Sequence, residues 1–134
     1  MPFPTQINLG YSWLLLDPVY AQRDEFRQAL EVRIRARLMR RSKAPFPWIP
    51  PLDEVVLTCS TLVLRADLPA RSGPALLQLA SENRANFTHL ELMYQTHNAL
   101  VPVVRGSDHV VLQHFRLAEG EGAGVPVFEV WLDS

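Results

Sequence analysis

The pattern of apolar and polar positions divides the chain into short segments. A short apolar run, residues 11–16, ends at Asp17-Pro18. Asp17 can cap a helix that has Pro18 at its first position, and this predicts a helix over residues 18–30. Over residues 30–39 the apolar positions alternate with three arginines. This period of two predicts a strand with an apolar inner face and an arginine outer face.

The remainder of the chain is predicted to be rich in strands. Prolines exclude regular structure from residues 40–51, whereas residues 54–68 form a long β-prone stretch that predicts two strands. Ser72, followed by Gly-Pro and several leucines, predicts the start of a helix. Turn-rich segments separate four further predicted strands, at residues 87–95, 100–105, 109–117 and 125–132.

Short turns between sequential strands favour antiparallel hairpins. We therefore expect an α+β fold: a single antiparallel sheet of about six or seven strands with helices packed on one side. A length of 134 residues, 48% of them hydrophobic, fits a single domain over residues 1–134 with its own core. An edge strand of such a sheet also allows pairing with a second copy, so a homodimer is a candidate assembly.

Charge and targeting features argue against two classes of partner. The formal net charge of −1 provides no global attraction to nucleic acid or to membranes. No stretch approaches the length of a transmembrane helix, and the first residues lack the features of a signal peptide. The only cysteine, Cys59, excludes an intramolecular disulfide. We therefore expect a cytoplasmic protein that binds neither nucleic acid nor membranes.

Cofactor chemistry also finds little support. None of the four histidines pairs with another at a spacing typical of metal ligands, so no metal site is expected. The chain has no Gly-x-Ser-x-Gly motif around a nucleophile, and no glycine loop suited to phosphate. The glycine-rich residues 119–124 are acidic and fit the tip of a hairpin. We expect no cofactor.

Two charged residues within predicted strands are candidates for function. Alternation in the last strand puts Glu129 on one face with Val127 and Trp131, where a carboxylate is either solvated or held for a purpose. Arg65 lies in the middle of its strand, and its guanidinium could grip a carboxylate through two hydrogen bonds. The alternative for Arg65 is a pair with Asp67 on a solvated face.

Three collinear segments resemble chorismate lyase. The residues SWLLLDPVYAQRDEF (12–26), followed by LEVRIRARL (30–38), are similar to the start of that family. The stretch DEVVLTCSTLVLRADLPARSGPALLQL (53–79) resembles its central hairpin, with an arginine shortly before a proline. The terminal FEVWLD resembles its last strand, which contains a glutamate.

The resemblance implies a specific activity and site. Chorismate lyases split chorismate into 4-hydroxybenzoate and pyruvate without metal or organic cofactor, in a small pocket enclosed between a sheet and helical flaps. By position, Glu129 matches the catalytic glutamate, which would protonate the substrate, and Arg65 matches a substrate-binding arginine. The chain departs from the family at Asp53, where a carboxylate-binding arginine is expected. Arg35, Arg37 or Arg105 would then have to supply the missing positive charge.

The resemblance leaves three functions open. The first is a domain that binds a small aromatic or cyclic carboxylate, with chorismate cleavage as its candidate activity. The second is a non-catalytic ligand-binding or regulatory module, because the same fold occurs in ligand-sensing domains of some bacterial transcription regulators. The third is a protein-interaction adaptor that docks a partner through Phe46 and Trp48 of the proline-rich segment 45–51.

Overall fold

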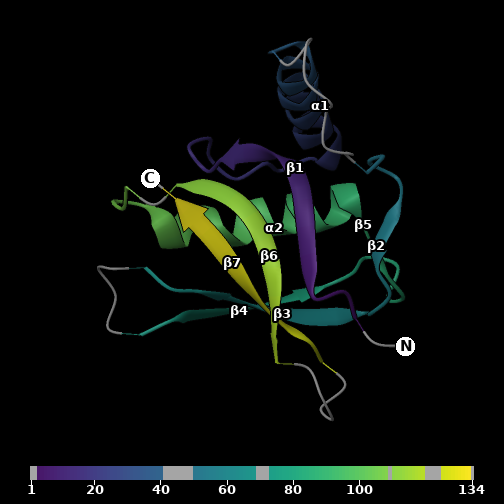
Figure 1. Cartoon of the computed structure of the whole chain (residues 1–134), viewed down its shortest axis with the longest axis vertical. Helices are drawn as coiled ribbons and strands as arrows, with labels where there is room; N and C mark the ends of the chain where they lie inside the picture. The colour runs from purple at the N-terminus through teal and green to yellow at the C-terminus, as the bar shows by residue number, and fades with distance from the viewer. Residues whose placement is uncertain (1–2, 41–49, 69–72, 109, 120–124, 134) are drawn as a thin grey trace.

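A computed structural model describes residues 3–40, 50–68, 73–108, 110–119 and 125–133 of the chain (Figure 1). Phe46, Trp48 and residues 120–124 of the acidic glycine-rich segment lie outside the described residues. The elements are, in chain order, β1 (Gln6–Leu14), α1 (Arg23–Arg40), β2 (Val55–Leu57), β3 (Thr61–Ala66), β4 (Ala75–Ala80), β5 (Phe87–Thr88), α2 (His89–Val104), β6 (Val111–Glu119) and β7 (Val127–Asp133).

Five of the strands form one mixed sheet in the order β1-β6-β7-β3-β4, and β2 pairs with β5 in a small second sheet. Neighbouring strands in the large sheet are antiparallel except for β3 and β7, which run parallel. The expected α+β class is confirmed. The expected single antiparallel sheet of six or seven strands is wrong, because three of the predicted strands fall largely within the two helices and one central pairing is parallel.

One face of the large sheet packs against α2, which runs behind the strands in Figure 1. Core side chains from the sheet include Leu64, Phe115 and Phe128, and α2 contributes Met93 and Leu100. Helix α1 lies beside β1 and rises away from the sheet (Figure 1). Within the described residues, no helix is both long and apolar enough to cross a membrane.

The strand expected over residues 30–39 is wrong, because α1 is a continuous helix of 18 residues. Its buried residues Phe26 and Leu30, and the partly buried Ile34, are spaced by four and form one helical stripe. Residues four positions apart lie on the same face of a strand and also on the same stripe of a helix. The alternation is therefore compatible with both a strand and a helix. The intervening arginines and alanines are strong helix formers, and this favours the helix. The helix begins at Arg23 rather than at Pro18.

The strands expected over residues 87–95 and 100–105 are wrong for a similar reason. Only Phe87 and Thr88 form a short strand, and the chain then enters α2. The Thr88 hydroxyl caps this helix by accepting a hydrogen bond of 3.1 Å from the backbone N–H of Glu91. Thr-x-x-Glu before an apolar run is a capping-box signature, so the sequence did contain a signal for this helix.

The helix expected from Ser72 is also wrong, because residues 75–80 form strand β4. β4 pairs antiparallel with β3 along its full length, from Ala66 opposite Ala75 to Thr61 opposite Ala80. Tertiary pairing therefore overrides a leucine-rich segment that carries a plausible helix start. The two strands expected within residues 54–68 are confirmed as β2 and β3, and those near the C-terminus as β6 and β7.

Candidate functional site

Glu129 lies on the face of the large sheet opposite α2. Along β7, Phe128 and Val130 are buried in the core, whereas Glu129 is half-buried and Trp131 is 47% exposed. The alternation expected for this strand is therefore confirmed. We refer to the face that carries Glu129 and Trp131 as the open face, since neither described helix packs on it (Figure 1).

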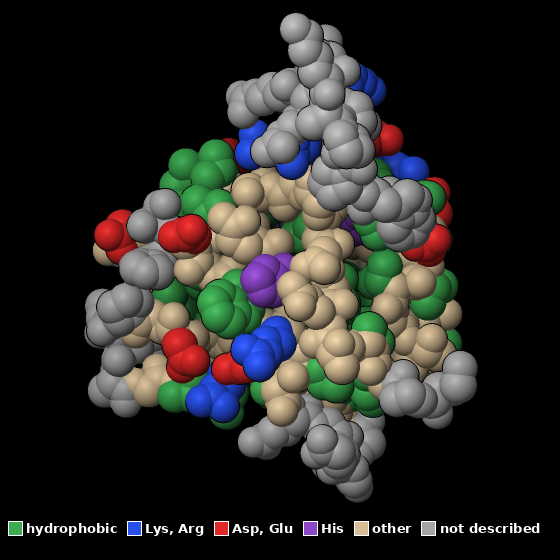
Figure 2. Space-filling model, viewed as in Figure 1, with side chains coloured by type: hydrophobic (Ala, Val, Ile, Leu, Met, Phe, Trp, Pro, Cys, Tyr) green, Lys and Arg blue, Asp and Glu red, His purple; other side chains and the backbone are tan. Residues whose placement is uncertain are grey.

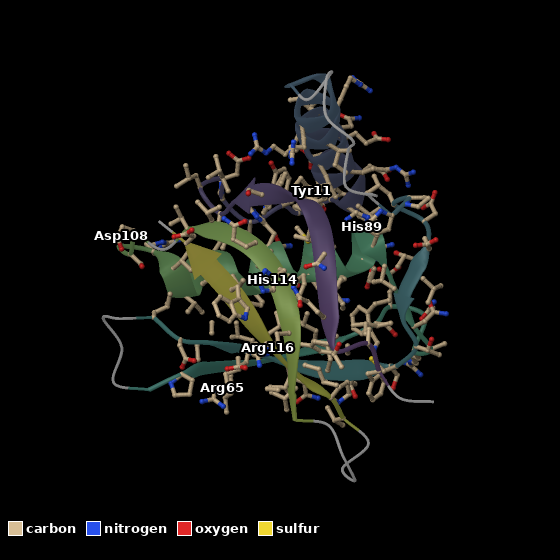
Figure 3. All side chains as sticks on the ribbon, viewed as in Figure 1. Tyr11, Arg65, His89, Asp108, His114 and Arg116 are labelled. Atoms are coloured by element: carbon tan, nitrogen blue, oxygen red, sulfur yellow. The ribbon has the colours of Figure 1, made fainter. Side chains whose placement is uncertain are left out.

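The strand register places Glu129 between two arginines. Arg116 on β6 is its antiparallel partner, and Arg65 on β3 is its parallel partner. Directly opposite residues on neighbouring strands have Cβ atoms about 5 Å apart, close enough for their side chains to interact. Figure 3 shows both arginines on the viewed side of the sheet. Gln6, opposite Arg116, and Leu76, opposite Arg65, extend the row to both edges of the sheet.

The Arg65 guanidinium is only weakly engaged. Its Nε atom lies 3.9 Å from a carboxylate oxygen of Asp67, and this atom has no hydrogen-bond partner. Asp67 is well exposed, and an exposed pair at this distance contributes little to stability. The expected alternative, a pair with Asp67, is therefore present but long. The Nε atom is itself buried, but the Arg65 side chain is 39% exposed, so its terminal N–H groups remain accessible to a further carboxylate.

An aromatic pair adjoins the arginine row. The rings of His114 and Trp131 are stacked, with centroids 5.2 Å apart and an interplanar angle of 21°, and the two residues are cross-strand partners. Partial burial, followed by the positive charge of Arg116, lowers the pKa of His114 below its usual value. The lowered pKa favours a neutral imidazole, which adds no second positive charge near Arg116.

These side chains form a mixed patch on an open surface. Figure 2 shows acidic and basic side chains gathered beside a histidine at the centre of this face. We define the sheet patch as Arg116, Glu129, Arg65, His114 and Trp131. Three cavities in the described structure, of about 230, 330 and 350 Å³, are lined by other residues.

The other predicted substrate-binding arginines lie away from the sheet patch, and Arg37, like Arg35, belongs to α1. Arg35 is an exposed residue of α1, which packs beside β1. Arg105 follows the last residue of α2, on the helix-covered side of the sheet, and lines the cavity of about 330 Å³ with Val104 and Ser107. Arg65 and Glu129 are thus brought together, whereas Arg35 and Arg105 are not. Arg116, which completes the row, was missed because only strand pairing reveals its position.

Asp53, the residue that departs from the lyase pattern, has a structural role. The Arg27 guanidinium donates two hydrogen bonds to its two carboxylate oxygens, at 3.1 and 3.2 Å. These hydrogen bonds, together with the Arg27 charge, lower the pKa of the Asp53 carboxyl. This forked pair links α1 to the chain just before β2.

A second polar cluster connects the two helices. Arg23 at the start of α1 pairs with Glu91, whose Oε1 lies 2.7 Å from Arg23 Nη2, and also with Glu82. The buried Glu91 carboxylate accepts a further hydrogen bond from the backbone N–H of Glu82. This cluster lines the cavity of about 230 Å³. The ion pair between Arg23 and Glu91 therefore links α1 to α2.

His89 and His97 both belong to α2, and both are buried. His89 Nε2 lies 2.6 Å from the Tyr11 hydroxyl, and its Nδ1 lies 2.8 Å from the Pro50 carbonyl oxygen. Burial lowers the pKa of both imidazoles. Among the described residues, no group of histidine, cysteine or carboxylate side chains is arranged to hold a metal ion.

Comparisons with known proteins identify no relative. No protein-family model matches the chain, and neither a curated protein nor a solved structure is significantly similar to it. Function therefore has to be inferred from the geometry of the sheet patch.

Proposed function

We propose that this chain is a protein-interaction domain whose open sheet face binds a partner segment that carries a carboxylate and an apolar side chain. One observation supports it above all. Arg116, Glu129 and Arg65 form a cross-strand row, beside the half-exposed Trp131, on a face that neither described helix covers.

The chemistry of the sheet patch suits protein recognition. Tryptophan and arginine are enriched among the residues that dominate binding energy at protein interfaces. Two arginines flank one glutamate, so the row attracts anions more strongly than cations. A partner carboxylate would pair with Arg116 or with Arg65 on the side of the arginine away from Glu129, and an apolar side chain would pack on Trp131. An open face accommodates an extended or folded segment better than a small ligand, which needs concave surroundings.

Selection from a displayed random-peptide library tests this proposal. We expect enriched peptides to combine Asp or Glu with a large apolar residue, and to shift backbone amide signals of β3, β6 and β7 in NMR spectra. Trp131→Ala should weaken binding at least about tenfold, and Arg116→Gln about three- to tenfold. Arg35→Gln removes an equivalent charge away from the open face, so it should leave affinity unchanged.

Two results would overturn the proposal. One is a selection that enriches no peptide. The other is a set of enriched peptides that bind the Trp131→Ala and Arg116→Gln variants as tightly as the unmodified chain. Circular dichroism of each variant separates loss of binding from loss of fold.

We propose binding of a small cyclic carboxylate as a second candidate, favoured by the position of Glu129 between two arginines. Following the resemblance, Glu129 would act as general acid on chorismate held by Arg65 and Arg116. Incubation with chorismate and detection of 4-hydroxybenzoate tests turnover, with Glu129→Gln as the inactive variant. Absence of product, together with no NMR response to 4-hydroxybenzoate, would exclude this candidate.

A further inference from the structure

The two edges of the large sheet differ in how they are protected. An edge strand presents unpaired N–H and C=O groups, which can pair with another chain unless the protein blocks them. The edges here are β1 and β4.

β1 is blocked in two ways. The pairing of β1 with β6 is interrupted between Asn8 and Trp13, and Gly10 in this interval has a φ of 80°, which is typical of a bulge. In addition, Arg33 of α1 donates a hydrogen bond of 2.8 Å from Nε to the backbone oxygen of Ser12. A bulged strand that also bonds to a neighbouring helix is a poor template for another strand.

β4 has none of the usual blocking features. Its sequence, Ala-Leu-Leu-Gln-Leu-Ala, contains neither a charged residue nor a proline. Leu76, on the open face, is 65% exposed. An uncharged, apolar and regular edge strand is the kind that natural proteins avoid exposing.

The register identifies which backbone groups of β4 face outward. The N–H of Ser81 donates to the oxygen of Ser60, so these two residues form a hydrogen-bonded pair. Hydrogen-bonded pairs alternate with non-bonded ones along an antiparallel ladder, so the bonded residues of β4 are Ala75, Leu77 and Leu79. Leu76 and Gln78 therefore direct their N–H and C=O groups away from β3. No described hydrogen bond reaches these groups.

The two ends of β4 support this assignment. Ala80 belongs to the outward set, and its carbonyl oxygen accepts a hydrogen bond of 2.7 Å from Gln95 of α2. Pro74, which continues the outward set at the other end, has no N–H to leave unpaired. The unpaired groups are thus concentrated around Leu77.

We propose that β4 pairs antiparallel with β4 of a second copy of this chain, about a two-fold axis at Leu77. In this register Leu76 of each copy forms a hydrogen-bonded pair with Gln78 of the other, and all their outward groups are satisfied. Leu77 faces Leu77 of the second copy as a non-bonded pair. At each end, the N–H of Ala80 in one copy donates to the carbonyl oxygen of Pro74 in the other. No outward donor or acceptor is then left unpaired.

Moving the two-fold axis by one residue in either direction satisfies fewer backbone N–H and C=O groups. An axis at Leu76 brings Gln78 opposite Pro74, which cannot donate. An axis at Gln78 brings Leu76 opposite Ala80, whose carbonyl already accepts from Gln95. The preference for Leu77 therefore follows from the positions of Pro74 and Gln95. The axis is perpendicular to the sheet, so the dimer would join two sheets and carry both open faces on the same side.

Cysteine crosslinking tests both the edge and the register. In a Cys59→Ser background, Leu77→Cys should form an intermolecular disulfide on mild oxidation, because Cα atoms of a non-bonded pair are about 4.5 Å apart. Leu76→Cys is the matched control. Position 76 is more exposed than position 77, but in the proposed register it lies opposite Gln78 of the second copy, two residues away from Leu76 of that copy. We expect at least about tenfold slower crosslinking from Leu76→Cys, since its Cα separation exceeds the roughly 7 Å limit for a disulfide.

Sedimentation equilibrium provides a second, independent readout. The unmodified chain should dimerise, and Leu76→Pro should raise the dissociation constant at least about tenfold by removing an outward N–H from each copy. Because that N–H does not bond to β3, the monomer should keep its fold by circular dichroism. Leu76→Lys, which places a charge at the same edge, should act in the same direction.

A monomeric unmodified chain at high micromolar concentration would overturn the proposal, as would equal crosslinking rates for Leu76→Cys and Leu77→Cys. Arg116→Gln, which alters the open face, should leave the dimer intact. Failure of peptide binding and failure of dimerisation are therefore distinguishable.

Discussion

The indole N–H of Trp13 donates a hydrogen bond of 3.0 Å to Nδ1 of His97, across 84 residues of sequence. Because an indole nitrogen only donates, Nδ1 has to be the unprotonated nitrogen. Nε2 then carries the proton and donates to the carbonyl oxygen of Pro18 at 3.0 Å. His89 repeats the arrangement with its nitrogens exchanged, between the Tyr11 hydroxyl and the Pro50 carbonyl. Both histidines join α2 to β1 as neutral rings.

The fold should lose stability in mild acid, at pH values above those at which carboxylates titrate. Burial lowers the pKa of both His89 and His97 below 6.5 in the folded state, so below pH 6.5 the unfolded chain binds protons that the folded chain does not. The free energy of unfolding therefore falls as pH falls, by up to about 1.4 kcal/mol per pH unit for each histidine. Urea unfolding at pH 7.5, 6.5 and 5.5 measures this slope. A free energy that stays constant over this window would contradict the neutral assignment.

Replacing Trp13 with phenylalanine should cost more than the change in size alone. The substitution leaves Nδ1 of His97 as a buried acceptor without a donor, at a cost of about 1–3 kcal/mol. Trp131→Phe on the open face is the matched control, since Trp131 is half-exposed and its neighbour His114 stacks on its ring. Chemical denaturation of both variants checks the difference. Equal losses would show that the hydrogen bond contributes nothing.

Thr88 should contribute measurably through its hydroxyl. Thr88→Ala removes the acceptor for the backbone N–H of Glu91 and should lower the free energy of unfolding by about 1 kcal/mol. Thr88→Ser keeps the oxygen and should recover most of that loss. Thermal unfolding of the pair separates the cap from other effects. If serine and alanine are equally destabilising, the methyl group rather than the hydroxyl is responsible.

Neighbouring residues of β7 should differ sharply in their effect on stability. Phe128 is fully buried in the core, and Phe128→Ala should cost about 3–5 kcal/mol because it leaves a cavity. Val127, half-buried on the opposite face of the strand, should lose less than about 1.5 kcal/mol when changed to alanine. Denaturant titrations of the two variants measure the contrast. Similar losses would mean that the open face is covered in solution.

Several features follow from local sequence alone. Alternation in VFEVWLDS separated Phe128 and Val130 from Glu129 and Trp131, because a strand has only two faces. The β-prone stretch from 54 to 68 also gave the correct two strands. The capping box at Thr88 and Glu91 also indicates the start of a helix, although the apolar residues after it predict a strand. Local chemistry in these segments agrees with the fold.

Tertiary structure decided the rest. Residues 30–39 fit both a strand and a helix, and burial of Phe26 and Leu30 on one stripe selects the helix. The leucines of β4 form a strand because β3 supplies a partner along its whole length. Likewise, an arginine on each side of Glu129 is a property of register, which depends on pairing between segments far apart in the chain. Sequence determined which face Glu129 occupies, and only the assembled sheet determined its neighbours, because side-chain alternation is local whereas strand pairing is not.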